Sequence, residues 1–157
     1  MSKSLVVYYS YSGITRNLAE NIALITDADI RELIPEKPYS FNYNSASKEA
    51  RNEIERGYCP KLISGNEYIS DYQLIFIGTP NWFSSFAPPI LTFLRSVDFC
   101  GKTVIPFCTH GGGGFGQIES SIYKECHNAN FLSGFSSTSD FDYKKIQEWI
   151  DWIKDTK

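Results

Sequence analysis

The 157-residue sequence lacks the features that define several large classes of protein. No apolar stretch approaches the roughly 20 residues of a membrane-spanning helix, and the short apolar run near the N-terminus is unlike a secretory signal. A net charge of −3 argues against nucleic-acid binding, which requires a cluster of basic residues. The four cysteines form neither a Cys-x-x-Cys pair nor a metal-ligand spacing, so we expect no metal site and a reducing, cytoplasmic location.

What is present is an alternation of apolar runs with helical patterns. The runs predict strands of a parallel sheet covered on both faces, and they lie at Leu5–Tyr9, Leu74–Gly78 and Val104–Cys108, with weaker ones at Ile30–Ile34 and Asn130–Gly134. Apolar residues recur at helical spacing between them, around residues 18–25, 90–97, 118–126 and 146–153. The sequence therefore predicts an α/β sandwich in a single domain, residues 1–157.

A polar segment at about residues 35–71 interrupts this alternation between the second and third strands. It contains three prolines and the charged pattern "SASKEARNEIERG", which predicts a helix that ends at Gly57. Excursions of this length are more often functional, or a cover for the surface, than slack chain.

The stretch "SYSGIT", residues 10–15, joins the first strand to the first helix. Backbone N–H groups and the positive end of a helix bind anions at such a junction, and Ser10, Ser12 and Thr15 add neutral hydroxyls. Ile14 stands where a P-loop requires lysine, and Gly13 alone does not make a dinucleotide fingerprint. The loop predicts a site for a phosphate monoester. The alternative is an ordinary turn with Ser12 or Thr15 as the helix cap.

Two further loops follow the third and fourth strands. "TPNWFSSFAPP" places Trp82 and Phe83 at a loop tip, where large rings suit a flat ligand. "THGGGGFG" carries five glycines, which suit a backbone that lies close against a ligand. The alternatives are rings that fold inward and a flexible connector. Because ligands of open α/β sheets bind at the carboxyl edge, the three loops together predict a phosphate-bearing planar heterocycle, and flavin mononucleotide (FMN) is the obvious candidate.

The three loops resemble those of the flavodoxin family, in particular its short bacterial flavodoxin-like members, and the resemblance runs from Leu5 to about Trp152. It implies a three-layer sandwich with a five-stranded parallel sheet in the order 2-1-3-4-5, an unsplit last strand and non-covalent FMN. The implied cofactor-binding residues are Ser10, Tyr11, Ser12, Gly13, Ile14 and Thr15 in the first loop, Thr79, Pro80, Asn81, Trp82 and Phe83 in the second, and Thr109, His110, Gly111, Gly112 and Gly113 in the third.

Two functions agree with this resemblance. One is a redox protein that acts in electron transfer through its flavin, with an unidentified donor and acceptor. The alternative is an NAD(P)H-dependent reductase of quinones or other small acceptors. The three loops contain no Asp or Glu, so the case for electrostatic attraction between this edge and a basic partner protein is weaker. We expect a monomer or weak dimer without nucleic-acid or membrane partners.

No catalytic residue is identified with certainty from the sequence. His110 is a candidate proton donor to a reduced flavin, and the alternative is a histidine that only bonds backbone. A phosphorylated receiver domain and a Cys-x5-Arg phosphatase are set aside, because Thr79 and Gly114 stand where an Asp and an Arg are required.

Overall fold

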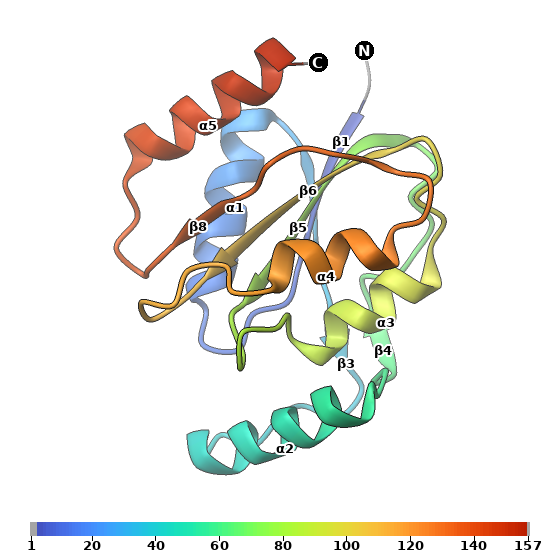
Figure 1. The fold of residues 1–157 in the computed structure, drawn as a ribbon, viewed down its shortest axis with the longest axis vertical. Helices are drawn as coiled ribbons and strands as arrows, with labels where there is room; N and C mark the ends of the chain where they lie inside the picture. Colours follow the sequence, from blue (N-terminus) through green and yellow to red (C-terminus); the bar gives the residue numbers. More distant parts are fainter. Residues whose placement is uncertain (1–2, 157) are drawn as a thin grey trace.

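A parallel sheet forms the centre of the molecule, and helices cover both of its faces (Figure 1). The computed structural model describes residues 3–156. The strands are β1 (Lys3–Tyr8), β2 (Asp29–Glu32), β3 (Ile34–Pro35), β4 (Leu62–Ser64), β5 (Tyr72–Pro80), β6 (Thr103–Thr109), β7 (Asn130–Phe131) and β8 (Phe135–Ser137). The helices are α1 (Ile14–Thr26), α2 (Tyr43–Arg56), α3 (Pro88–Ser96), α4 (Ile118–Glu125) and α5 (Tyr143–Thr156). Within the described part of the chain, no helix is long and apolar enough to cross a membrane.

The strands of the main sheet lie in the order β2-β1-β5-β6-β7, and all of them are parallel. Strand β8 is also parallel to β6 and pairs with its last three residues, whereas β7 pairs with its first two. The predicted α/β fold with a parallel sheet is confirmed. The order matches 2-1-3-4-5, with the fifth position shared by β7 and β8.

Only residues 132–134 separate β7 from β8, so the last strand is interrupted briefly and carries no inserted segment. The Leu132 N–H still donates to the Val104 carbonyl oxygen (3.2 Å). Two residues further along the same edge of β6 stands Pro106, which has no N–H to donate to a neighbouring strand. The ladder is interrupted at this point.

Successive side chains along the inner strands point to opposite faces of the sheet, so the core has two parts, one on each face. Val7 and Ile75 pack with α3 and α4, whereas Val6 and Phe76 pack with α1 and α5, and all four are completely buried. Burying each such side chain stabilises the fold by about 1.5–3 kcal/mol. Burial on both faces explains why these strands are unbroken apolar runs in the sequence.

The polar excursion lies off the carboxyl ends of the strands, where α2 runs across the edge of the sheet (Figure 1). Its two short strands, β3 and β4, pair antiparallel beside the main sheet. The predicted charged helix is present. It begins after Asn42, whose Oδ1 accepts from the Ser45 N–H (3.1 Å), and Gly57 ends it in the left-handed conformation (φ 62°).

Contacts fix α2 to the body of the protein. The Tyr39 hydroxyl donates to Glu53 Oε1 (2.5 Å) on the helix, and the Thr92 hydroxyl of α3 donates to the Pro60 carbonyl oxygen (2.6 Å) just after it. The helix therefore has a defined position over the carboxyl edge.

Candidate functional site

The first loop turns into α1 through Gly13, which adopts φ 99° and ψ −9°. Ser10 Oγ accepts a hydrogen bond from the Gly13 N–H (3.0 Å), and Gly13 is itself the N-cap residue without a side-chain cap. The alternative in which Ser12 or Thr15 caps the helix is therefore wrong. Ser12 and Ile14 are exposed, and the N–H groups of the first turn have no acceptors within the helix. The loop therefore presents neutral hydrogen-bond donors at the edge of the sheet.

A buried hydrogen bond joins the first loop to the third. The Oγ1 atoms of Thr15 and Thr109 lie 2.8 Å apart, and the two residues are only 2% and 5% exposed. The start of α1 is thereby fixed to the end of β6. Two of the predicted cofactor residues, 94 positions apart in the sequence, are in direct contact.

The second loop contains a tight turn at Trp82–Ser85, in which Trp82 and Ser85 exchange backbone hydrogen bonds of 2.9 and 3.0 Å. Phe83 and Ser84, at the tip, have φ of 57° and 62°. This conformation costs a non-glycine residue about 1–2 kcal/mol. The Asn81 side chain offsets part of that cost by accepting from the Ser84 N–H (2.9 Å). Sequence reasoning missed the turn because such tips usually carry Asn or Gly.

Trp82 lies half-buried in a cluster of tyrosines. Its ring makes edge-to-face contacts with Tyr9, Tyr11 and Tyr39 at centroid distances of 5.6, 5.9 and 5.3 Å. Phe83 remains 49% exposed, with the Arg51 guanidinium 5.4 Å from its ring centroid. The inward-folded alternative thus holds in part for Trp82 but not for Phe83.

Two tyrosines of this cluster, Tyr9 and Tyr39, have raised pKa values, which favour their neutral forms. Burial raises the pKa of Tyr9 and of Tyr39, and for Tyr39 the hydrogen bond to Glu53 adds to that effect. The Tyr11 hydroxyl donates to the Ser40 carbonyl oxygen (2.7 Å), which links the first loop to the excursion.

The second and third loops are held together by the Asn81 side chain and by a close backbone approach. Asn81 Nδ2 donates to the Gly114 carbonyl oxygen (2.7 Å), and the Gln117 N–H donates to the Ser84 carbonyl oxygen (3.1 Å). A Cβ at Gly116 would lie 2.1 Å from Ser84 Oγ, so only glycine permits this approach. At Gly116 the glycine run therefore has a structural role in the contact between the two loops, and it does not serve only as a flexible connector.

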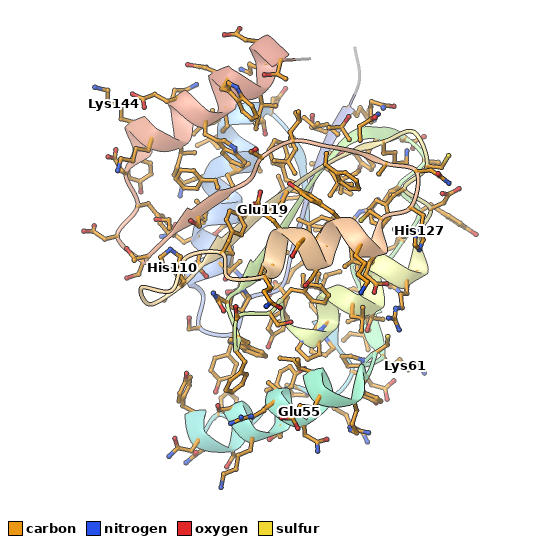
Figure 2. The ribbon with its side chains drawn as sticks, viewed as in Figure 1. Glu55, Lys61, His110, Glu119, His127 and Lys144 are labelled. Atoms are coloured by element: carbon orange, nitrogen blue, oxygen red, sulfur yellow. The ribbon has the colours of Figure 1, made fainter. Side chains whose placement is uncertain are left out.

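The remaining predicted residues of the third loop lie at the carboxyl edge. A Cβ at Gly113 would lie 3.9 Å from Asn81 Nδ2, whereas Cβ atoms at Gly111 and Gly112 would meet open space. Figure 2 places His110 on the same loop. Its Nδ1 accepts from the Gly112 N–H (2.9 Å), which favours the backbone-bonding interpretation over proton donation.

Thr79 does not lie where the sequence interpretation placed it. The residue is fully buried, and its hydroxyl accepts from the Ala87 N–H (2.9 Å) and donates to the Pro80 carbonyl oxygen (2.8 Å). It therefore positions the start of α3 and has no surface with which to contact a cofactor. Pro80, the next residue, is half-buried at the end of β5.

Cys108 lies beneath the third loop, where its thiol donates to the Gly114 carbonyl oxygen (3.6 Å). Burial, with a smaller contribution from the charge of Glu119 (Figure 2), raises its pKa to about 12. Burial likewise raises the pKa of Cys126 to about 12. Neither thiol is a nucleophile at neutral pH.

Two hollows border the loops. One, of about 240 Å³, lies between the first two loops and α2, and Tyr11, Asn81, Trp82 and Phe83 form one wall of it. The other, of about 340 Å³, lies between the first loop and the beginning of the excursion. The sequence analysis allowed a functional or covering role for the excursion, but it named none of the α2 residues that line the first hollow. The small residues Ala46 and Ala50, four positions apart, mark the buried face of this helix and were the available signal.

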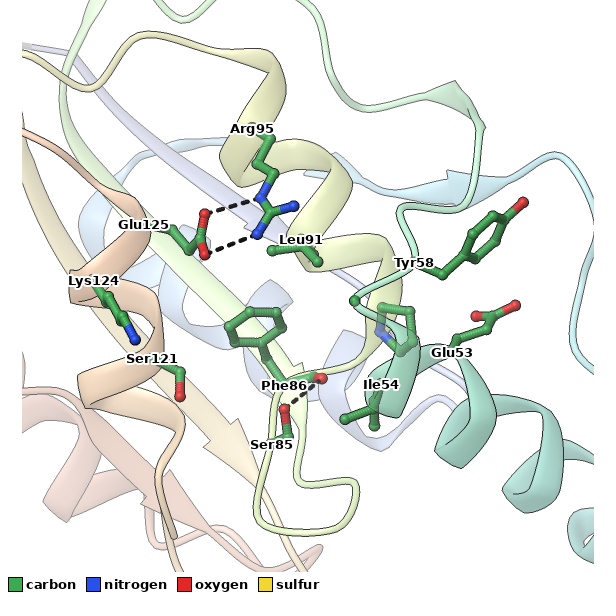
Figure 3. Close-up of a pocket in the computed structure, with 12 residues that line it drawn as sticks. Glu53, Ile54, Tyr58, Ser85, Phe86, Leu91, Arg95, Ser121, Lys124 and Glu125 are labelled. Carbon is green, nitrogen blue, oxygen red and sulfur yellow. Dashed lines mark hydrogen bonds and ion pairs between the residues drawn. The ribbon is translucent and has the colours of Figure 1, made fainter.

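A third hollow, of about 250 Å³, lies between α2, α3 and α4, and none of the predicted site residues lines it (Figure 3). Its lining is strongly charged. Arg95 forms a two-pronged ion pair with Glu125 (3.0 and 3.2 Å), and this pairing lowers the pKa of the Glu125 carboxyl. Lys124 and Glu53 also line it. The candidate site is therefore the loop edge and not this hollow.

The chain is similar in sequence and in fold to known proteins. A sequence model of the flavodoxin family matches residues 3–153. A candidate flavoprotein from Bacteroides uniformis superposes with a TM-score of 0.87 at 28% identity, covering 96% of this chain and 98% of that one. Another, from Bacteroides eggerthii, gives 0.85 at 31% identity, covering 98% and 99%. A Lactobacillus acidophilus flavoprotein solved in complex with FMN gives 0.76 at 25% identity, covering 96% and 99%. No functionally curated protein matches the sequence.

Proposed function

The chain belongs to the flavodoxin family, and on that basis we propose that it binds FMN without a covalent bond and acts in electron transfer. The observation that carries the proposal is the convergence of the loops after β1, β5 and β6 on one edge. The Thr15–Thr109 and Asn81–Gly114 hydrogen bonds hold them in a fixed arrangement. The FMN complex of the Lactobacillus acidophilus relative supports the choice of cofactor.

The residues of the first loop fit a phosphate group. A Cβ at Gly13 would meet open space, so the turn leaves room beside the backbone donors. Ser10 and Ser12 add hydroxyls, and no carboxylate lies within the loop to repel the anion. Arg16, in the first turn of α1, is paired with Glu32. We therefore expect the phosphate to be held by neutral amides and hydroxyls together with the positive end of the helix.

The other two loops would hold the flavin ring. Trp82 and Phe83 supply aromatic surface, and the backbone of Gly111–Gly113 supplies donors and acceptors without side-chain bulk. When bound, FMN supplies reversible one- and two-electron chemistry, while the protein orients it and limits its access to water.

The test is the absorbance spectrum of the purified protein, followed by titration of the flavin-free form with FMN and with riboflavin. We expect FMN to bind at least about tenfold more tightly, because one charged hydrogen bond contributes about 1.5–3 kcal/mol. Equal affinity for the two flavins would contradict the phosphate assignment. A protein that stays colourless after incubation with FMN would overturn the proposed function.

A second candidate function is the NAD(P)H-dependent reduction of quinones or similar small acceptors. It is favoured by the absence of Asp and Glu from the three loops and by the uncharged hollow beside Trp82. Rapid steady-state oxidation of NAD(P)H by the FMN-loaded protein with a quinone, and without a partner protein, would support it. A dependence on a protein partner would favour the electron carrier.

A further inference from the structure

The hollow of about 240 Å³ beside Trp82 has one wall that belongs to none of the three loops. Tyr43, Ala46, Ser47 and Ala50 of α2 form this wall, and their spacing places them on one face of the helix. Because α2 is fixed through Glu53 and through the Tyr11–Ser40 hydrogen bond, the hollow exists before any ligand arrives.

The lining of this hollow carries no charged side chain. Its surfaces are aromatic rings, alanine methyl groups and the Ser47 hydroxyl, since the Asn81 amide is already engaged by Ser84 and Gly114. Tyr43, the first residue of α2, belongs to the lining and is 70% exposed. Ligand pockets are lined mainly by apolar and aromatic side chains with a few polar groups, and this hollow has such a lining.

The size of the hollow limits its occupant. Drug-sized ligands occupy pockets of about 300–1,000 Å³. At about 240 Å³, this hollow suits a molecule of one or two fused rings and is too small for a nicotinamide dinucleotide. The charged hollow in Figure 3 has a similar volume, but the Arg95–Glu125 pair and Lys124 make it unsuitable for an uncharged ring.

We propose that the hollow between α2 and the Tyr11–Phe83 wall binds a small, uncharged, planar electron acceptor of the quinone class. The inference rests on the proposed function, because Tyr11, Asn81, Trp82 and Phe83 belong both to this hollow and to the proposed flavin site. Reduced FMN gives up two electrons and two protons, and the quinone takes them to become a hydroquinone. A chemical reductant such as dithionite supplies the electrons to the flavin in the test below.

Two matched variants of α2 test the proposal. Ser47→Phe adds a ring inside the hollow at a half-buried position, so the fold has room to accept it. Lys48→Phe adds the same ring one residue further on, at an exposed position outside the hollow. Binding of 1,4-naphthoquinone to the oxidised, FMN-loaded protein is measured by calorimetry, where no electron transfer can occur. Re-oxidation of the dithionite-reduced protein is then timed with naphthoquinone and with ferricyanide, an anionic acceptor.

We expect Ser47→Phe to weaken naphthoquinone binding by about tenfold or more and to slow re-oxidation by naphthoquinone, while the affinity for FMN changes by less than about twofold. Re-oxidation by ferricyanide should be unchanged, and Lys48→Phe should behave as the wild type. Unaltered naphthoquinone binding in Ser47→Phe overturns the inference. An equal loss of FMN affinity also overturns it, because the hollow would then hold the flavin itself. Failure of the wild type to bind FMN refutes the proposed function instead.

Discussion

Replacing Trp82 by alanine separates its packing role in the structure from its proposed role in flavin binding. In the flavin-free protein, Trp82 contacts Tyr9, Tyr11 and Tyr39 edge to face. Each such contact stabilises the fold by about 0.5–1.5 kcal/mol beyond simple burial. Because the ring is only half-buried, we expect Trp82→Ala to lower the free energy of unfolding by about 2–4 kcal/mol, short of the upper limit for a buried tryptophan.

The same substitution should weaken FMN binding separately. Loss of an aromatic stacking partner costs about 1–3 kcal/mol, which corresponds to an increase in Kd of about 5- to 150-fold. Unfolding of the flavin-free protein is followed in urea. The Kd for FMN is then measured by flavin fluorescence at a temperature where the variant is fully folded.

Trp149→Ala is the matched control. Trp149 is also half-buried and packs against Phe76 and Phe135 at centroid distances of 5.7 and 5.2 Å, but it lies on α5, away from the three loops. It should lose stability and keep its affinity for FMN. A wild-type Kd in Trp82→Ala would refute the ring assignment, and a comparable loss of FMN affinity in Trp149→Ala would show that the effect is a general loss of packing.

Three further predictions follow from the described residues. Gly13→Ala should lower the free energy of unfolding, measured in urea, by about 1–2 kcal/mol, because Gly13 has a positive φ that alanine disfavours. It should also weaken FMN binding, whereas Gly57→Ala should lower stability and leave the affinity for FMN unchanged. A thiol reagent should modify only the exposed Cys59 and Cys100 in the native protein and all four cysteines after unfolding; a third fast-reacting native thiol would contradict this. The raised pKa of Tyr39 favours the neutral form in the folded state, so its contribution to stability is complete below about pH 10 and falls at higher pH. The stability advantage of the wild type over Tyr39→Phe, measured in urea, should therefore shrink above pH 10, and an advantage that grows there would refute the assignment.

The pattern of apolar and polar residues is sufficient to predict the sheet and the places where its loops emerge. Strands such as Leu74–Gly78 had to be covered on both faces, because an unbroken apolar run has no side suited to water. The loop "SYSGIT" had to open a helix, and parallel strands bring their following loops to one edge. The resemblance to flavodoxins, now supported by the family match over residues 3–153, rested on those loops.

The way in which these parts meet is visible only in the folded molecule. The Thr15–Thr109 bond, the burial of Thr79 and the path of α2 across the carboxyl edge depend on residues far apart in the chain. The spacing of residues in the sequence does not show which hydroxyl of the first loop faces β6. The orientation of each side chain depends on the packing of the whole sheet. The turn at Phe83–Ser84 likewise exists because Asn81 and the third loop hold it in a conformation that its own residues disfavour.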